Sequence, residues 1–359
     1  MSARVTVGMA VYNGATTIAD SIRSVLAETY PDFELLLVDD GSTDDSCTVI
    51  DGFDDPRIRL LRNEGNLGLV ATRNRIVHQA RGEFIAWLDQ DDLSAPDRMA
   101  TQVAYLDRHP AVAVCGGQTA LLVQHGDGRV TRTIERFPTS PHAIRAAMPF
   151  LNPIACNTVM MRRAPFSGTD PFRPAFGNSL DYDLWSRAGD TMLVVNLPGV
   201  LGSYRIHAGQ TSQGAALERM NRHALDVQVE LLHRILDLDI TEDQRTLHRQ
   251  ATTAPVDVAN GEDVQGIAEW FAGIRRANAT VRASGLPGFD PAALDAALAR
   301  QWTTVTLAAQ RSLGRGHAAR LAHAGARRIG LPMGALLASG AAGLGRRMRR
   351  RAARRAVSA

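Results

Sequence analysis

The sequence predicts an α/β fold, namely a doubly wound and mostly parallel sheet followed by a C-terminal helical extension. The first observation is the β-α-β-α-β-α-β order of apolar runs and amphipathic stretches between Val5 and Leu88. The second is that the apolar runs ending at Val38 and Leu88 stop abruptly at clustered aspartates. Because parallel strands present their carboxyl ends at one edge of a sheet, where open α/β sheets bind ligands, both observations indicate one site there.

Local patterns predict each element of this region. Val5–Val11 is apolar with few breaks, as a strand buried on both faces should be. A turn at residues 12–14 leads into a helix that Thr16 or Thr17 can cap and that runs to about Glu28. We expect the remaining strands at residues 33–38, 58–61 and 84–88, and helices at residues 43–50 and after the turn at residues 66–68.

The rest of the chain has a different character. Between Ala111 and Ile206, short strand-like stretches alternate with loops, and Asp181 and Asp183 stand in the first turn of an expected helix. The strand-like stretches are residues 112–115, 157–161, 192–195 and 200–204. From about Leu217 apolar residues recur at helical spacing, and residues 262–278 and 291–309 also favour helices.

Composition and charge exclude several classes of function. Lysine is absent, so all 40 basic residues are arginine, which excludes a lysine Schiff base and a P-loop lysine. Twelve arginines lie from Arg311 onward, where there is no acidic residue, so residues 1–310 carry 28 arginines against 37 acidic residues. The basic excess therefore belongs to the tail, and we expect no nucleic-acid partner.

The spacing of the cysteines and the length of the apolar runs indicate the cellular location of the protein. Cys47, Cys115 and Cys156 are too widely spaced for a metal or redox motif, which favours a reduced, cytoplasmic chain. The sequence starts directly with a strand-like segment, so we expect no secretory signal. No apolar run reaches the roughly 20 residues of a membrane-spanning helix.

The stretch from Phe84 to Asp92 carries the strongest chemical signal. A short apolar strand ends in Asp89, Asp91 and Asp92, whose like charges repel and cost desolvation energy beside that strand. A divalent cation such as Mg²⁺ or Mn²⁺, with bound phosphates, would relieve both costs, because hard cations prefer oxygen ligands. The alternative is a solvated acidic turn in which Asp92 or Ser94 caps a following helix.

Six motifs, each at a strand end or a helix start, resemble those of the family 2 glycosyltransferases, which have the GT-A fold. They are the first strand leading into Tyr12-Asn13, Val38-Asp39-Asp40-Gly41-Ser42-Thr43-Asp44, Asn66-Leu67-Gly68 with Arg73-Asn74, Leu88-Asp89-Gln90-Asp91-Asp92, Asp181-Tyr182-Asp183-Leu184-Trp185 and Tyr204-Arg205-Ile206-His207. The resemblance implies a GT-A domain at residues 1–212, with a nucleotide-binding half at about 1–110 and an acceptor half at about 111–212. A helical region at residues 213–310 and an arginine-rich tail at residues 311–359 would follow.

The family resemblance also implies an activity and a donor site. The enzyme would move a sugar, usually with inversion, from a nucleoside-diphosphate sugar to a hydroxyl of a glycan or lipid-linked acceptor, with Mn²⁺ or Mg²⁺. Ala10, Tyr12 and Asp39 would hold the nucleobase, and Arg73 would lie near the diphosphate. Asp89 would approach the ribose and the metal.

The remaining roles implied by the resemblance concern the metal and the base. Asp91 would be the direct metal ligand, with His207 near the metal and the diphosphate, and Asp181 would be the general base. The chain departs from the family at Leu180, where an acid is usual, which leaves Asp183 as the alternative base. An apolar neighbour such as Leu180 would raise the pKa of Asp181 by desolvation.

Two other functions remain open on the same residues. A nucleotidyltransferase could use a similar sheet and acidic cluster, but it would release pyrophosphate rather than a nucleoside diphosphate. A non-catalytic nucleotide-sugar-binding protein would keep Asp39 and Asp91 and would not need Asp181.

Several motif residues also have simpler interpretations. We expect Asp40 and Asp44 to cap the following helix and Trp87 and Trp185 to lie in the core. Arg205 is open to a purely structural role as an ion-pair partner.

The arginine-rich tail suggests a membrane partner. Residues 331–344 are apolar but too short to span a bilayer, and arginines flank them on both sides. Such a segment could lie on an anionic membrane and place the enzyme peripherally at the cytoplasmic face, near a lipid-linked acceptor. The alternative is a basic extension that does not fold, which the five glycines between Gly330 and Gly345 favour.

Overall fold

The computed structural model describes residues 3–125, 129–206, 214–253, 256, 258–332 and 335. These residues form two compact units. The first contains the chain up to residue 141 and residues 154–216, and the second contains residues 142–153 and the chain from Leu217 onward. His207 and nearly all of the tail after Pro332 lie outside the described residues, so the predictions made for them concern residues that the structure does not describe.

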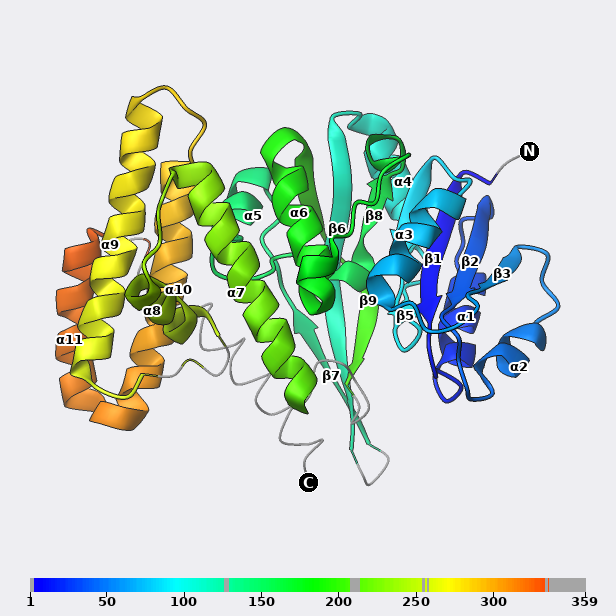
Figure 1. Ribbon diagram of the computed structural model, residues 1–359, viewed down its shortest axis with the longest axis horizontal. Coiled ribbons are helices and arrows are strands. Elements are labelled where there is room, and N and C mark those ends of the chain that lie inside the picture. The colour runs from blue at the N-terminus through cyan, green and yellow to red at the C-terminus, as the bar shows by residue number, and fades with distance from the viewer. Residues whose placement is uncertain are drawn as a thin grey trace. The chain divides into compact units, whose positions relative to one another are not determined.

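The first unit is built on one sheet (Figure 1). In the described residues it has nine strands in the order β3-β2-β1-β4-β8-β6-β9-β5, with β7 paired to β6. The strands are β1 Val5–Val11, β2 Phe33–Asp39, β3 Ile58–Arg62, β4 Phe84–Trp87, β5 Leu93–Ser94, β6 Val112–Gln124, β7 Val130–Glu135, β8 Met160–Arg162 and β9 Leu193–Ile206. The helices of this unit are α1 Ile18–Leu26, α2 Ser46–Asp51, α3 Leu69–Gln79, α4 Arg98–Arg108 and α6 Leu180–Thr191, with 3₁₀ turns at Cys156–Thr158, Ala164–Phe166 and Pro174–Ser179.

The half of the sheet formed by β3, β2, β1 and β4 is parallel, as the sequence predicts. Val11 lies opposite Asp39, and Gly8 lies opposite Trp87. This register brings the carboxyl ends of β1, β2 and β4 to the same edge of the sheet. The loops that carry the acidic motifs therefore leave the sheet next to one another.

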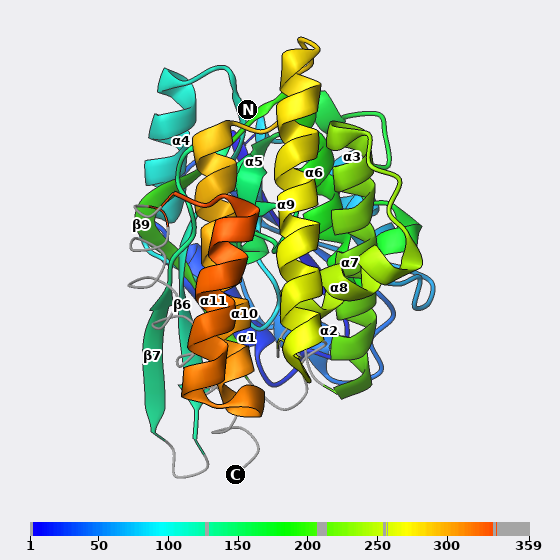
Figure 2. The ribbon, with the colours of Figure 1, turned by 90° about the vertical axis from the view of Figure 1, so that its left-hand side faces the viewer.

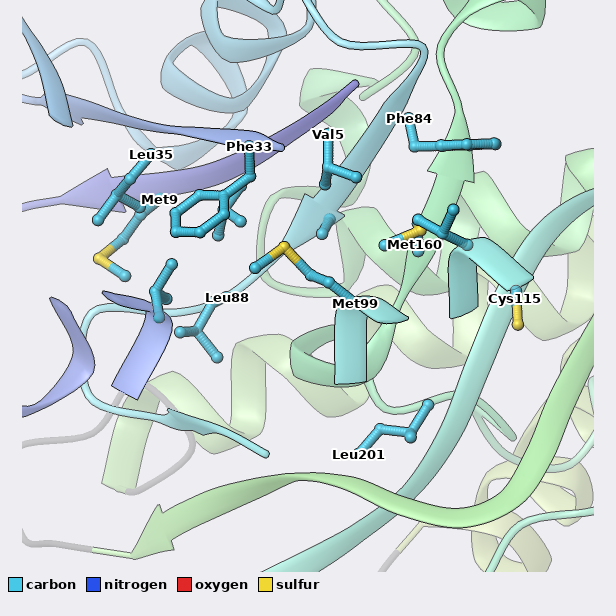
Figure 3. Close-up of a cluster of buried hydrophobic side chains, with 14 of the residues drawn as sticks. Val5, Met9, Phe33, Leu35, Phe84, Leu88, Met99, Cys115, Met160 and Leu201 are labelled. Atoms are coloured by element: carbon cyan, nitrogen blue, oxygen red, sulfur yellow. The ribbon is translucent and has the colours of Figure 1, made fainter. Parts of the chain in front are cut away.

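Both faces of this parallel half are covered. On one face Val5 and Met9 of β1 are buried in a cluster that includes Ile22 of α1 and Met99 of α4 (Figure 3). On the other face a Cβ added to Gly8 would lie 2.6 Å from Cγ2 of Ile76 in α3, so glycine allows α3 to pack closely on β1. Burial on both faces explains why these strands read as continuous apolar runs rather than as alternating ones.

The other half of the sheet is mixed, and the sequence predicted it only in part. β6 and β9 pair in parallel, whereas β4–β8, β6–β8, β6–β7 and β5–β9 are antiparallel. The strand expected at residues 112–115 continues to Gln124, and those expected at residues 192–195 and 200–204 are one strand, β9. A Cβ on Gly117 would lie 2.5 Å from Cδ1 of Leu201, so glycine at this position lets β6 and β9 approach closely.

Helix α4, which the sequence analysis did not identify, contributes a buried arginine to the core of the first unit. Arg98 is 1% exposed, and its Nη2 donates to the carbonyl oxygens of Trp87 and Val159, both at 2.9 Å. Burial lowers the pKa of this guanidinium. Arg98 therefore satisfies two carbonyls where β4 ends and where the chain enters β8, which holds the start of the acidic loop in place.

The second unit is helical. Its helices are α5 Pro141–Ala147, α7 Gly214–Leu236, α8 Glu242–Thr252, α9 Gly261–Ala283, α10 Pro291–Leu313 and α11 Arg315–Ile329. The helices predicted at residues 262–278 and 291–309 correspond to α9 and α10, and α11 lies beside both (Figure 2). Within the described part of the chain, no helix is both long and apolar enough to cross a membrane.

His248 lies in the core of the second unit. It is 0% exposed, its Nδ1 accepts from Trp270 Nε1 at 3.0 Å, and its Nε2 bonds to the carbonyl oxygen of Pro149 at 2.9 Å. A neutral ring with its proton on Nε2 satisfies both bonds, whereas a charged ring could not accept from Trp270. Burial lowers the pKa of His248 from 6.5 to about 4.

We expect this histidine to make the stability of the second unit depend on pH. The unfolded chain binds a proton at His248 below pH 6.5 while the folded chain does not, so stability falls as pH drops from 6.5 toward about 4. His248→Gln keeps both hydrogen bonds but cannot titrate. Between about pH 7 and about pH 5 the wild type should lose about 2 kcal/mol more than the variant in urea unfolding followed by helix circular dichroism. Equal losses in the two proteins would contradict this.

Candidate active site

The candidate site lies at the carboxyl edge of the parallel strands in the first unit. Leu88 N, just after β4, donates to Gly8 O at 3.2 Å, which sets Asp89 level with the end of β1. Ala10 is the penultimate residue of β1 and is half-buried, and Tyr12 follows the strand with 44% of its surface exposed. Residues that are far apart in the sequence are thus brought to one edge by strand pairing alone.

Gln90, in the middle of the acidic motif, fixes the turn after β1. Its Oε1 accepts from Tyr12 N at 3.0 Å, and its Nε2 donates to Tyr12 O at 2.9 Å. A Cβ on Gly14 would collide with the Gln90 amide, so this approach requires glycine. Asn13 adopts φ = 49°, and its Oδ1 accepts from Thr43 N at 2.8 Å. The turn that carries Tyr12 is therefore held from both neighbouring loops.

The two aspartates at the end of β2 have different partners. Asp39 is 3% exposed and accepts from Ser42 N at 3.3 Å. The prediction that Asp40 caps the following helix is wrong, because its carboxylate accepts from Leu67 N and Gly68 N, both at 2.9 Å. Asp40 thus organises the turn before α3, a contact that local sequence could not reveal.

Asp44 stands one residue before the N-cap of α2, so the prediction that it caps this helix is wrong by one residue. It accepts from the backbone N–H of Ser46, the first residue of α2, at 3.0 Å, and also from Ala15 N at 3.0 Å. It therefore joins the start of α2 to the turn after β1.

Arg73 of α3 binds the first aspartate of the acidic motif. Its Nη2 donates to Asp89 Oδ1 at 2.6 Å, and its Nη1 donates to Cys156 Sγ at 3.2 Å. The side chain is 6% exposed, and its guanidinium carbon lies 5.5 Å and 5.8 Å from the ring centroids of Trp87 and Phe172. Arg73 is therefore held rigidly between α3, the end of β4 and the 3₁₀ turn at Cys156.

Electrostatic interactions connect Asp181 with this cluster. Burial lowers the pKa of Arg73, but its interactions with the neighbouring Cys156, Asp89 and Asp181 together raise it above its ordinary value. Burial raises the pKa of the Cys156 thiol, with Arg73 opposing the shift and Asp181 and Asp89 adding to it. Asp181 and Asp89, which come from different elements, thus act on the same guanidinium.

Asp181 and Asp183, both in the first turn of α6, have unlike surroundings. Asp183 is 0% exposed and is bound by two arginines: Arg187 Nη2 donates to it at 2.9 Å, and both Nε and Nη2 of Arg173 donate to it. Asp181 is half-buried and follows Leu180, which is 3% exposed. The carboxylate of Asp183 is therefore occupied by ion pairs within the fold. This favours Asp181 over Asp183 as the residue that contacts a substrate.

Arg205, at the end of β9, binds the last two aspartates of the acidic motif, Asp91 and Asp92. Its backbone N–H donates to Asp92 Oδ1 at 3.0 Å, and its Nε donates to the carbonyl oxygen of Asp91. Its Nη1 reaches Asp20 of α1 at 3.1 Å. The structural role left open for Arg205 in the sequence analysis is therefore confirmed. Burial, and then the charges of Asp91 and Asp89, raise the pKa of Asp92 well above its ordinary value.

The donor atoms of this loop suit a divalent cation that is shared with phosphates. Such an ion needs only one or two carboxylates, since phosphate oxygens and water supply its other ligands. The side chain of Asp89 is 38% exposed, and the hydrogen bond from Arg73 is to its Oδ1. Asp91 is half-buried. Asp92 Oδ2 is buried without a hydrogen-bond partner among the described residues. Those residues contain no ready group of three His, Cys, Asp or Glu ligands, and His207 is not among them.

Trp87 and Trp185 lie in the core as predicted, at 2% and 0% exposure. The sequence analysis missed Cys156 and the bracing role of Gln90. Gln90 stands inside a motif that was recognised, so its position was a usable signal. Cys156 meets Arg73 across 83 residues of chain, and no local pattern marks that contact.

Comparisons with known proteins identify the family of the chain. The family model described as "Glycosyl transferase family 2" matches residues 6–167. An uncharacterized glycosyltransferase of Haemophilus influenzae is 30% identical over 216 residues, which are 58% of this chain and 67% of that protein. The Escherichia coli enzyme WfaP, named a UDP-Glc:alpha-D-GlcNAc-diphosphoundecaprenol beta-1,3-glucosyltransferase, is 27% identical over 65% of this chain and 90% of its own length.

A solved structure shows the same fold. It is Staphylococcus aureus TarS (residues 1–349) in complex with UDP-GlcNAc, with a TM-score of 0.54 and 18% identity over 92% of this chain and 93% of that one. At this identity the likeness concerns the fold alone. From these similarities we conclude that the chain has the GT-A fold, belongs to glycosyl transferase family 2, and is a glycosyltransferase.

Proposed function

We propose that this glycosyltransferase moves a sugar, with inversion, from a nucleoside-diphosphate sugar to a hydroxyl of a glycan or lipid-linked acceptor, with Mn²⁺ or Mg²⁺ at Asp89 and Asp91. The observation that carries the proposal is the shared guanidinium of Arg73, which is bound to Asp89 and feels the charge of Asp181. The loop proposed for the donor and the acid proposed as base thus both act electrostatically on one guanidinium. WfaP, named for a UDP-glucose donor and a diphosphoundecaprenol-linked acceptor, supports both substrate classes.

The residues divide the proposed reaction between them. Asp39, with the turn of Ala10 and Tyr12, receives the nucleobase, and Arg73 holds Asp89 toward the diphosphate. The divalent ion, when bound, neutralises charge on the leaving diphosphate. Asp181 takes the proton from the acceptor hydroxyl, and one base on the acceptor side is what direct displacement with inversion requires. His207, outside the described residues, stays a proposed neighbour of the metal.

We expect metal-dependent donor binding to require Asp91. With Mn²⁺ present, a panel of nucleotide sugars that includes UDP-GlcNAc and UDP-glucose should contain a donor that raises the melting temperature. At a concentration of about 100 times Kd, such a donor adds about 3 kcal/mol of stability. Asp91→Asn should lose this shift because a carboxylate ligand is gone, whereas Asp54→Asn, an exposed control in the same unit, should keep it. Equal donor affinity in the Asp91 variant with and without chelator would refute the metal site.

We expect Asp181→Asn to lower turnover by about 10² or more while donor binding stays intact, because only the base is lost. Turnover is followed as release of nucleoside diphosphate, whereas a nucleotidyltransferase would release pyrophosphate. Asp183→Asn is the matched control. It leaves Arg173 and Arg187, which are 36% and 30% exposed, without their carboxylate and should cost roughly 1–3 kcal/mol of stability. A folded, inactive Asp183 variant beside an active Asp181 variant would make Asp183 the base.

We also propose that the arginine-rich tail holds the enzyme peripherally at the cytoplasmic face of the membrane. The support is the sequence of residues 331–359 and the lipid-linked acceptor in the name of WfaP. Replacing the seven arginines of residues 346–355 by glutamine should release the full chain from anionic vesicles in sedimentation at low salt, since each arginine contributes about 1 kcal/mol. If the wild type itself stays in the supernatant, the tail is not a membrane anchor.

A further inference from the structure

Helix α11 has one side that is fixed in the second unit. Ala318 and Ile329 are 1% and 2% exposed, and Trp302 Nε1 of α10 donates to the carbonyl oxygen of Ala322 at 3.0 Å. A Cβ on Gly325 would collide with the Trp302 ring, so the packed side is built from small residues. These contacts determine which side chains of α11 are exposed.

The opposite side of α11 is cationic. Arg320, His323 and Arg327 are exposed and follow one another at spacings of three and four residues, which places them on one stripe of the helix. In the described part of the chain neither Arg320 nor Arg327 has an acidic partner. Glu269 of α9, the acid that reaches α11, is bound by Arg328 and also by Arg276 at 3.4 Å. The stripe therefore keeps its positive charge.

This charge distribution is unlike that of α7 in the same unit. α7 places Glu218, Asp226 and Glu230 among its arginines, and Arg234 pairs with Glu230 at 3.3 Å. α11 contains four arginines and no acid. A surface helix usually mixes both signs, so a helix that is positive throughout calls for an anionic partner.

We propose that the Arg320–His323–Arg327 stripe of α11 docks on an anionic phospholipid surface. Between the charged positions the exposed side carries alanine and glycine, with no Trp, Tyr, Phe, Asn or Gln in the whole helix. Such a smooth cationic side fits a plane of lipid phosphates, whereas binding of single-stranded nucleic acid also uses aromatic side chains that stack on the bases, and α11 has no Trp, Tyr or Phe. The chain also continues from α11 into the apolar and arginine-rich tail.

This inference extends the proposed function by giving the enzyme a structured contact, in addition to the tail, with the surface where a lipid-linked acceptor resides. Docking through α11 does not depend on turnover. It can therefore be tested separately from donor binding, and the two proposals can fail independently.

The test compares the full-length wild type with Arg320→Gln/Arg327→Gln and with Arg219→Gln/Arg222→Gln. The second pair removes the same charge from exposed positions of α7. Binding is measured by sedimentation with phosphatidylcholine vesicles, with and without phosphatidylglycerol, at low and high salt. We expect the wild type to bind only the phosphatidylglycerol vesicles at low salt. The affinity of the α11 variant for these vesicles should be lower than that of the wild type by a factor on the order of ten or more. The α7 variant should bind nearly as the wild type does.

Three results would overturn the proposal. They are no wild-type binding to phosphatidylglycerol vesicles, equal weakening in the two variants, or binding to an RNA duplex but not to vesicles. The donor-induced thermal shift is measured on the same samples. If that shift persists while vesicle binding fails, the docking surface is wrong and the proposed function stands. If vesicle binding depends on α11 but no nucleotide sugar stabilises the protein, the proposed donor chemistry is wrong instead.

Discussion

The structure of the first unit depends on holding three carboxylates within four residues at the end of a buried strand. Asp89, Asp91 and Asp92 repel one another, and the surrounding elements offset that repulsion without covering the loop. Arg73 reaches Asp89 from α3, and Arg205 reaches the loop from β9. Gln90 turns the same loop against the segment after β1. The loop is consequently the place where α3, β1 and β9 are fixed relative to one another, so an acidic site and a rigid scaffold arise from the same contacts.

Because the chain has no lysine, the side chains that hold these loops in place are arginines. The geometry of the guanidinium group suits this role. The planar fork of arginine offers several donors at fixed angles. Arg205 uses them to reach an aspartate and backbone oxygens from two elements, and Arg98 uses one nitrogen to satisfy two buried carbonyls. On α11, Arg320 and Arg327 are left exposed without acidic partners among the described residues, whereas Arg328 pairs with Glu269. Arginine is thus a structural brace inside the sheet unit and a source of surface charge on the helical unit.

Environment separates two aspartates that stand two residues apart on α6. The carboxylate of Asp183 is enclosed and held by Arg173 and Arg187, so proton transfer there would break buried ion pairs. Asp181 is half-buried, and its charge acts on the guanidinium of Arg73. Leu180, which stands directly before Asp181, is buried. Fixing Asp183 so firmly also fixes the first turn of the helix from which Asp181 projects.

The sequence by itself determined the parallel half of the sheet, the aspartates at the ends of β2 and β4, and the helices α9 and α10, because each is encoded by contiguous residues with a recognisable period or turn. Only the tertiary structure decided the partners of those side chains. Asp40 holds a turn 27 residues away rather than its own helix, and Arg205 N meets Asp92 across 113 residues. The long pairing of β6 with β9 was not predicted, because the contact of Leu201 with Gly117 joins strands that are far apart in the sequence. Contacts of this kind depend on which surfaces meet when the chain folds, so the periodicity of the local sequence does not predict them.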